Sequence, residues 1–160
     1  MDQKDEQGLD IWINLRFSTQ KHTDKETVLK NLSMWISSQI REKSDPQELL
    51  SSIQEREALG TTGFGDGFAI PHGKVKNLKK PALIVVRLEE ATQWDALDDQ
   101  KVDHLFIILV PKEDTDNRHL SLLSTLAYHL MDDEIKKQVK TIQEEKEMRC
   151  LIETIFEKGR

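Results

Sequence analysis

The chain has 160 residues, of which 37% are hydrophobic and 32% charged, and its net charge is −6 at pH 7. This length and composition fit one globular domain with a real core, and the acidic balance argues against direct nucleic-acid binding. Cys150 is the only cysteine, so no internal disulfide can form. No apolar run approaches the ~20 residues of a transmembrane helix, and residues 1–8 do not resemble a secretory signal. We therefore expect a cytoplasmic protein without membrane insertion.

The first part of the chain predicts a strand followed by two helices. Residues 9–17 alternate between apolar and polar side chains, as in a half-buried strand. Residues 23–26, Thr-Asp-Lys-Glu, have the capping-box pattern of a helix start, and apolar residues follow at helical spacing up to Ile40. Residues 45–48, Asp-Pro-Gln-Glu, predict a second helix with proline at its first position.

The middle of the chain predicts a loop and buried strands. Residues 60–67 are rich in glycine and are expected to form a loop that leads into a short strand, residues 68–70. The continuous apolar runs 83–86 and 105–110 are typical of central strands that are buried on both faces. Residues 94–101 between these runs form a polar turn region.

Three further helices are expected after the last strand. The first is capped by Asp116 or Asn117 and runs to about Met131, and the others contain residues 135–142 and 148–155. Strands interspersed with helices predict the α/β class, with a mixed central sheet flanked by helices on both faces. We predict an N-terminal extension, residues 1–8, and one compact domain, residues 9–160.

His72 is the strongest candidate for a functional side chain. Proline fixes the backbone before it and biases Ile70 toward an extended conformation. Gly73 after it is expected to allow a ligand to approach the backbone closely. Functional groups concentrate on loops that a rigid scaffold holds. The alternative interpretation is an ordinary surface histidine in a turn.

His119 and Arg56 occupy positions where a helix face is otherwise apolar. On a helical wheel His119 falls in line with Leu123, Leu126 and Leu130, in the first turn, where the helix dipole favours an anion. Its alternative role is a core histidine that bonds a carbonyl.

Arg56 shares the inner face of Leu49 and Ile53 near a helix end. Its guanidinium either extends to solvent or points into a shared cleft, where paired donors suit phosphate. We interpret the remaining candidates as ordinary: His22 as solvated, His104 and His129 as structural, and Cys150 as a surface or boundary residue.

The order and spacing of several motifs resemble one known family. Arg56-Glu57, the glycine-rich loop, Ala69-Ile70-Pro71-His72-Gly73 and His119-Leu120 are similar to the enzyme IIA domain of the fructose/mannitol class of the bacterial phosphoenolpyruvate-dependent sugar phosphotransferase system. Thr61 or Thr62, Trp94 and residues 102–110 also match the family pattern, and the likeness runs from about residue 10 to residue 156.

The resemblance implies a phosphohistidine carrier with a compact α/β fold. It implies that His72 accepts a phosphoryl group from the phosphocarrier HPr and passes it to a cysteine of an enzyme IIB domain during sugar uptake. His119 and Arg56 would line the same site, with neither a metal nor a cofactor. Association with a membrane IIC component is also implied. The sequence contains no segment that we match to a IIB, IIC or HPr domain, and Cys150 does not match a IIB cysteine.

Three other functions remain open at this point. A regulatory enzyme IIA-like receiver of a sugar-responsive transcription activator would use the same site. A metal-dependent hydrolase would use His72, His119 and nearby carboxylates, but no closely spaced ligand pair in the sequence supports it. A purely structural interaction module would bind its partner regardless of His72.

Overall fold

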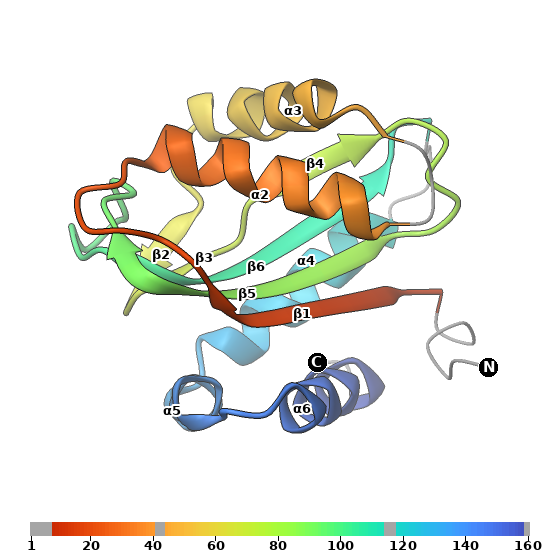
Figure 1. Ribbon diagram of the computed structural model, residues 1–160. Coiled ribbons are helices and arrows are strands. Elements are labelled where there is room, and N and C mark those ends of the chain that lie inside the picture. The colour runs from red at the N-terminus through yellow and green to blue at the C-terminus, as the bar shows by residue number, and fades with distance from the viewer. Residues whose placement is uncertain (1–7, 41–43, 114–117, 159–160) are drawn as a thin grey trace. The chain divides into compact units, whose positions relative to one another are not determined.

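The computed structural model describes residues 8–40, 44–113 and 118–158, without the side chains of residues 118 and 119 (Figure 1). It divides into two compact units, Met1–Glu113 and Asp114–Arg160, and each is described by itself. Among the described residues, the first unit holds the sheet and two helices, and the second holds three helices. Of the predicted extension, residues 1–8, only Gly8 lies within the described residues.

The sheet is mixed, as the sequence predicts. Its strands are β1 (Asp10–Phe17), β2 (Gly63–Gly65), β3 (Phe68–Ala69), β4 (His72–Val75), β5 (Ala82–Thr92) and β6 (Val102–Pro111). β1 pairs with β5 in parallel, and β5 pairs with β6 antiparallel. β3 and β4 both pair with β6 in parallel, and β2 pairs antiparallel with β3. The α/β class with a mixed central sheet is therefore confirmed.

The two central strands are buried because both of their faces are apolar. Leu105, Ile107 and Leu109 of β6 belong to the main core cluster. Phe106 and Ile108 alternate with them on the opposite face and are equally buried. Burial on both faces agrees with the continuous apolar run in the sequence, because in a strand with one solvated face apolar residues would alternate with polar ones.

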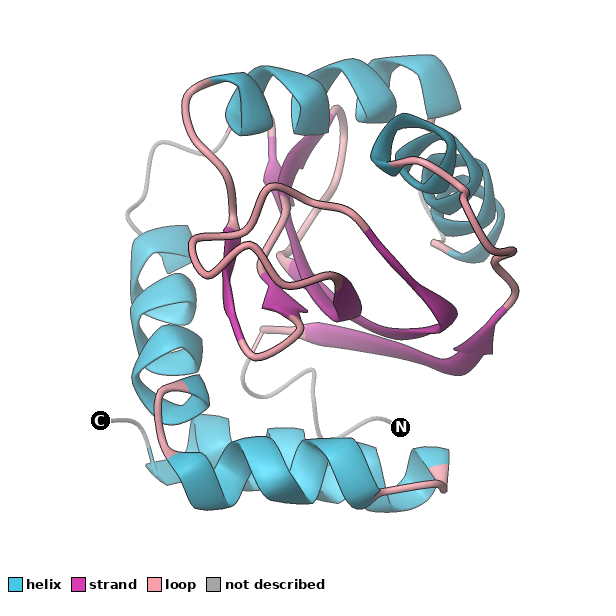
Figure 2. Ribbon diagram, turned by 90° about the vertical axis from the view of Figure 1, so that its left-hand side faces the viewer, coloured by secondary structure: helices cyan, strands magenta, loops and turns pink. Residues whose placement is uncertain are grey.

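Two helices of the first unit cover one side of the sheet, α2 (Lys25–Gln39) and α3 (Pro46–Ala58), as both views show (Figure 1 and Figure 2). Asp24 is the N-cap of α2, and its carboxylate accepts the Thr27 N–H at 2.8 Å. Hydrogen bonding from the Thr27 hydroxyl, and then from the Thr27 N–H, lowers the pKa of Asp24. The cap therefore lies one residue after the Thr23 that begins the capping-box pattern. Asp45 caps α3 and Pro46 is its first residue, as predicted.

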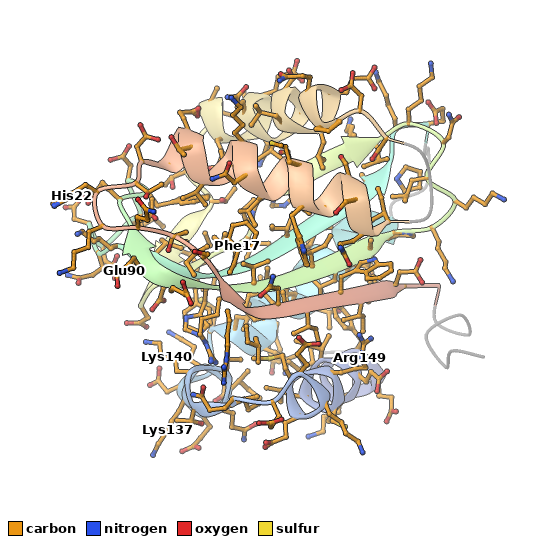
Figure 3. All side chains as sticks on the ribbon, in the orientation of Figure 1. Phe17, His22, Glu90, Lys137, Lys140 and Arg149 are labelled. Carbon is orange, nitrogen blue, oxygen red and sulfur yellow. The ribbon has the colours of Figure 1, made fainter. Side chains whose placement is uncertain are left out.

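The start of α2 follows a turn that begins where β1 ends. Phe17, the last residue of β1, packs edge-on against Trp35 of α2 with ring centroids 6.0 Å apart. His22 lies in the turn, exposed and with a φ of 67°, and its solvated placement is confirmed (Figure 3). Buried α2 residues then follow at helical spacing, namely Val28, Leu29, Leu32, Ser33 and Ile36.

The second unit contains α4 (Arg118–Leu130), α5 (Asp133–Thr141) and α6 (Glu145–Lys158), where three helices are predicted. The predicted cap of the first of them, Asp116 or Asn117, lies outside the described residues. Asp132 caps α5 by accepting the Glu134 N–H at 2.8 Å. Within the described ranges, no helix has both the length and the apolar character needed to cross a membrane.

Candidate functional site

The backbone around His72 is fixed on both sides of the residue. Pro71 is buried, and its carbonyl accepts the Ile108 N–H at 2.9 Å. His72 is the first residue of β4 and lies opposite Ile108 in the parallel register with β6. The interpretation as a turn residue is therefore wrong, because neighbouring β6 extends the sheet to His72. The side chain itself is half-buried.

Gly73 serves the packing of α3 rather than the approach of a ligand. A Cβ at this position would lie 3.0 Å from Cδ1 of Leu49, 3.1 Å from Cγ1 of Ile53 and 3.1 Å from Cδ2 of Leu109. The absent side chain lets α3 contact β4 directly, so the sequence-based reason for this glycine was wrong. The packing ties the position of α3 to the strand that carries His72.

The same packing brings the C-terminal end of α3 toward the His72 end of β4. Ser52 of α3 accepts the Lys74 N–H at 2.7 Å. Nearer the start of α3, its N-cap Asp45 and Glu48 line a cavity together with Val75 and Lys76. Increasing residue numbers in α3 thus correspond to decreasing numbers in β4, and the last turn of α3, which contains Arg56, lies at the end where β4 begins.

Arg56 closes the last turn of α3. Its side chain is half-buried, and its Nη1 donates to the Gly60 carbonyl at 2.8 Å. A guanidinium has five N–H donors, so this bond leaves it further donors that can meet an anion. The predicted placement at the helix end is confirmed, and its role in the site stays a prediction.

The glycine-rich loop is more ordered than the sequence predicts. Residues 63–65 form the short strand β2, and the turn that follows has positive φ at Gly65 (120°), Asp66 (58°) and Gly67 (87°). Glycine adopts this backbone region without strain. The Asp98 carboxylate accepts the N–H groups of Asp66 and Gln100, both at 3.0 Å, and these bonds lower the pKa of Asp98.

His119 is the second residue of α4, in the second unit, and its side chain lies outside the described residues. Leu126 and Leu130, in line with it on the helical wheel, are buried, whereas Leu123 is half-buried. The amphipathic face on which the prediction rests is therefore present. The place of His119 beside His72 and Arg56 stays a prediction.

Two polar clusters of the first unit involve residues to which the sequence analysis gives no part in the site. Glu57 accepts hydrogen bonds from Thr62 and from Lys25. In the other cluster, Nε of Arg87 donates to Nε2 of His104 at 3.1 Å, and Nδ1 of His104 lies 2.7 Å from Oδ1 of Asp103. His104 is buried, as the structural interpretation predicts, and its ring stacks on Phe68 with centroids 5.2 Å apart.

In the part of the chain that the structure describes, no three His, Cys, Asp or Glu side chains lie together as a metal site requires. Cys150 is exposed on α6, in agreement with its interpretation as a surface residue.

Comparison with known proteins relates nearly the whole chain to one family. The family model described as "Phosphoenolpyruvate-dependent sugar phosphotransferase system, EIIA 2" matches residues 13–155. The chain is 30% identical over 132 residues, or 82% of its length, to the PTS system 2-O-alpha-mannosyl-D-glycerate-specific EIIABC component of Escherichia coli, and it spans 19% of that relative. It is 40% identical over 108 residues to the nitrogen regulatory protein of Escherichia coli, which covers 67% of the chain and 66% of that relative.

Solved structures with the same fold include a nitrogen regulatory protein and a complex of enzyme IIA with enzyme IIB. The nitrogen regulatory protein IIA-Ntr of Neisseria meningitidis superimposes with a TM-score of 0.76 at 27% identity, covering 91% of this chain and 97% of that one. The complex of enzyme IIAMTL with phosphorylated enzyme IIBMTL of Escherichia coli gives a TM-score of 0.65 at 17% identity, over 89% of this chain and 99% of the matched one. The second likeness concerns the fold alone.

Proposed function

Because the chain belongs to the EIIA 2 family of the phosphoenolpyruvate-dependent sugar phosphotransferase system, we propose that it is a phosphohistidine carrier whose acceptor is His72. It takes the phosphoryl group from phospho-HPr in the cytoplasm and passes it to a cysteine of an enzyme IIB domain. The observation that carries the proposal is the fixed backbone of Pro71 and His72 at the start of β4. The last turn of α3, which contains Arg56, lies toward this same end of the strand.

An imidazole suits a carrier because it is both a nucleophile and a leaving group. With an ordinary pKa of about 6.5, imidazole is largely neutral at pH 7, and one ring nitrogen has a lone pair. That lone pair attacks phosphorus while the bond between phosphorus and the donor breaks and its electron pair stays on the donor. In the second step a thiolate attacks phosphorus, and the N–P electron pair returns to the ring of His72.

The rest of the site has to place and neutralise the phosphoryl group, because negative charge spreads over its outer oxygens during transfer. Arg56 supplies a permanent positive charge and N–H donors beyond the one that Gly60 accepts. His119, near the N-terminus of α4, would supply a second imidazole donor. Neither step requires a metal or a cofactor.

We expect Arg56→Ala and His119→Ala to slow phosphorylation of His72 without unfolding the protein. Removal of one such donor costs about 2.7–4 kcal/mol of barrier, a factor of roughly 100–1,000 in rate. The measurement is the single-turnover rate of phosphate uptake from phospho-HPr, with circular dichroism as the check on folding. Arg16→Ala, an exposed arginine on β1, is the control and should react like the parent. A rate for Arg56→Ala within twofold of the parent rate would remove Arg56 from the site.

A regulatory role is the second candidate, and the 40% identity to a nitrogen regulatory protein favours it. The chemistry at His72 would be the same, but phosphorylation would control a partner instead of supplying transport.

Transfer from the phosphorylated chain to a thiol separates the two roles. The phosphorylated protein is mixed with purified IIB domains, among them the mannitol IIB domain of Escherichia coli, and the label is followed over seconds. Carrier function predicts that at least one IIB domain gains a cysteine-bound phosphate while the chain loses its own. A chain that accepts phosphate from HPr and retains it with every IIB domain favours the regulatory role.

A further inference from the structure

The carboxylate of Glu57 is held at the last turn of α3 by three donors. It accepts the hydroxyl of Thr62, the Thr62 N–H at 3.3 Å and the Lys25 ammonium at 2.7 Å. Only 6% of the Glu57 side chain is exposed, compared with 20% for Lys25. A carboxylate this far from water is tolerated when charge and hydrogen bonds replace its hydration, so the three donors act as a set.

The donors reach Glu57 from two other elements of the same unit. Lys25 is the first residue of α2, and its ammonium also lies 4.9 Å from the centre of the Trp94 ring. Thr61, beside Thr62 in the glycine-rich loop, donates its hydroxyl to the Trp94 carbonyl at 3.3 Å. The Glu57 carboxylate therefore joins α2, α3 and the loop.

Thr62 links this junction to the segment that carries His72. Its carbonyl accepts the N–H of Ile70 at 3.1 Å, and Ile70 directly precedes Pro71 and His72. On the other side of Glu57, the neighbouring Arg56 donates to Gly60, at the start of the same loop. The Glu57 carboxylate thus adjoins Arg56 in the chain and is connected through Thr62 and Ile70 to the segment that carries His72.

We propose that Glu57 is a positioning residue for phosphoryl transfer. Paired with Lys25 and bonded to Thr62, it fixes the glycine-rich loop so that His72 and Arg56 keep a productive separation. This inference rests on the proposed function, since it assigns Glu57 a part in the reaction at His72. A misplacement of about 1 Å in a reacting group can cost on the order of 100-fold in rate, so a remote carboxylate can have a large effect.

The kinetic test compares Glu57→Ala with Glu55→Ala, because Glu55 is an exposed acid on the same helix. Glu57→Ala should lower the maximal single-turnover rate by about 10- to 100-fold, with little change in the phospho-HPr concentration that gives half the maximal rate. Phosphorylation should still reach completion. Glu55→Ala should match the parent. A folded Glu57→Ala protein with the parent rate would overturn the proposal.

Two further variants separate positioning from a general loss of stability. Glu57→Gln retains an acceptor for the Thr62 hydroxyl and should recover most of the rate. Thr62→Val should reproduce the defect of Glu57→Ala. The double variant that combines Glu57→Ala with Thr62→Val should be no slower than either single variant, because each substitution interrupts the same connection between Glu57 and Thr62. Effects that multiply in the double variant would contradict a shared connection. If Glu57→Ala does not fold, Glu57→Gln and Thr62→Val still decide the question.

Hydrogen exchange gives a readout that does not depend on phosphorylation. The Ile70 amide, which donates to Thr62, should exchange at least tenfold faster in Glu57→Ala than in the parent, and should be unchanged in Glu55→Ala. Unchanged Ile70 exchange would overturn the positioning role even if the parent is phosphorylated. If the parent accepts no phosphate while Ile70 exchange responds as expected, the proposed function fails and the link from Glu57 to Ile70 stands.

Discussion

We expect replacement of His72 by alanine to abolish phosphate uptake from phospho-HPr and to leave the fold intact. The substitution removes the ring nitrogens that are proposed to form the N–P bond. Alanine fits the extended backbone of a half-buried strand residue, and Pro71 and Gly73 keep their own contacts. The measurement is the acid-labile, base-stable label bound after incubation with labelled phospho-HPr.

His22→Ala is the matched control for this experiment. His22 is an exposed histidine in the same unit, so its removal tests whether any surface imidazole accepts the label. The variant should bind as much phosphate as the parent. If His72→Ala binds label as the parent does, the assignment of the acceptor is wrong.

Trp94→Ala should lower the free energy of unfolding by about 3–5 kcal/mol. The Trp94 side chain is fully buried in the core cluster. A Cβ at Gly63 would lie 3.1 Å from Cδ1 of Trp94, so the backbone of Gly63 packs closely against this side chain. The loss has two components, the removal of a large apolar side chain from the interior and the cavity that remains. Urea unfolding followed by far-UV circular dichroism measures it without reliance on tryptophan fluorescence.

Leu97→Ala, three residues along the same segment, is the control for the core substitution. Leu97 is 77% exposed, so its truncation should change the unfolding free energy by about 0.5 kcal/mol at most. A loss below about 1 kcal/mol for Trp94→Ala would show that the segment after β5 is not part of the core.

The features that the sequence predicts well are those set by local chemistry. Proline at the first position of α3 and the Asp45 cap depend on a few consecutive residues, and both are present. The apolar runs of β5 and β6 identify the central strands because burial on both faces leaves no polar alternation.

Pairing between distant segments accounts for most of what the sequence does not predict. β2 contains two glycines in three residues and has no side-chain pattern, and it is a strand because β3 pairs with it. β4 is a strand because β6 lies beside it, which places His72 in the sheet rather than in a turn. The far end of β5, which includes Glu89 and Glu90, is polar, and its extension to Thr92 follows from pairing with Val102.

The candidate site likewise contains residues that the local sequence indicates and a residue whose contacts depend on the fold. Pro71-His72-Gly73 and Arg56 are visible in the sequence, since proline, histidine and glycine in series and a cation on an apolar helix face are local signals. Glu57 stands beside Arg56 in one of the motifs that carry the resemblance, but its neighbours in sequence do not indicate its partners. Its contact with Thr62 arises only when the chain reverses at Gly60 and brings Thr62 back to the last turn of α3.

The central claim is that one ring nitrogen of His72 carries the phosphoryl group, and the most direct measurement is its location in the parent protein. The chain is labelled with phospho-HPr, digested under alkaline conditions and mapped by tandem mass spectrometry. We predict an acid-labile phosphate on His72 in near-stoichiometric yield. A phosphate on a different histidine, on Cys150 or on a hydroxyl side chain would contradict the account.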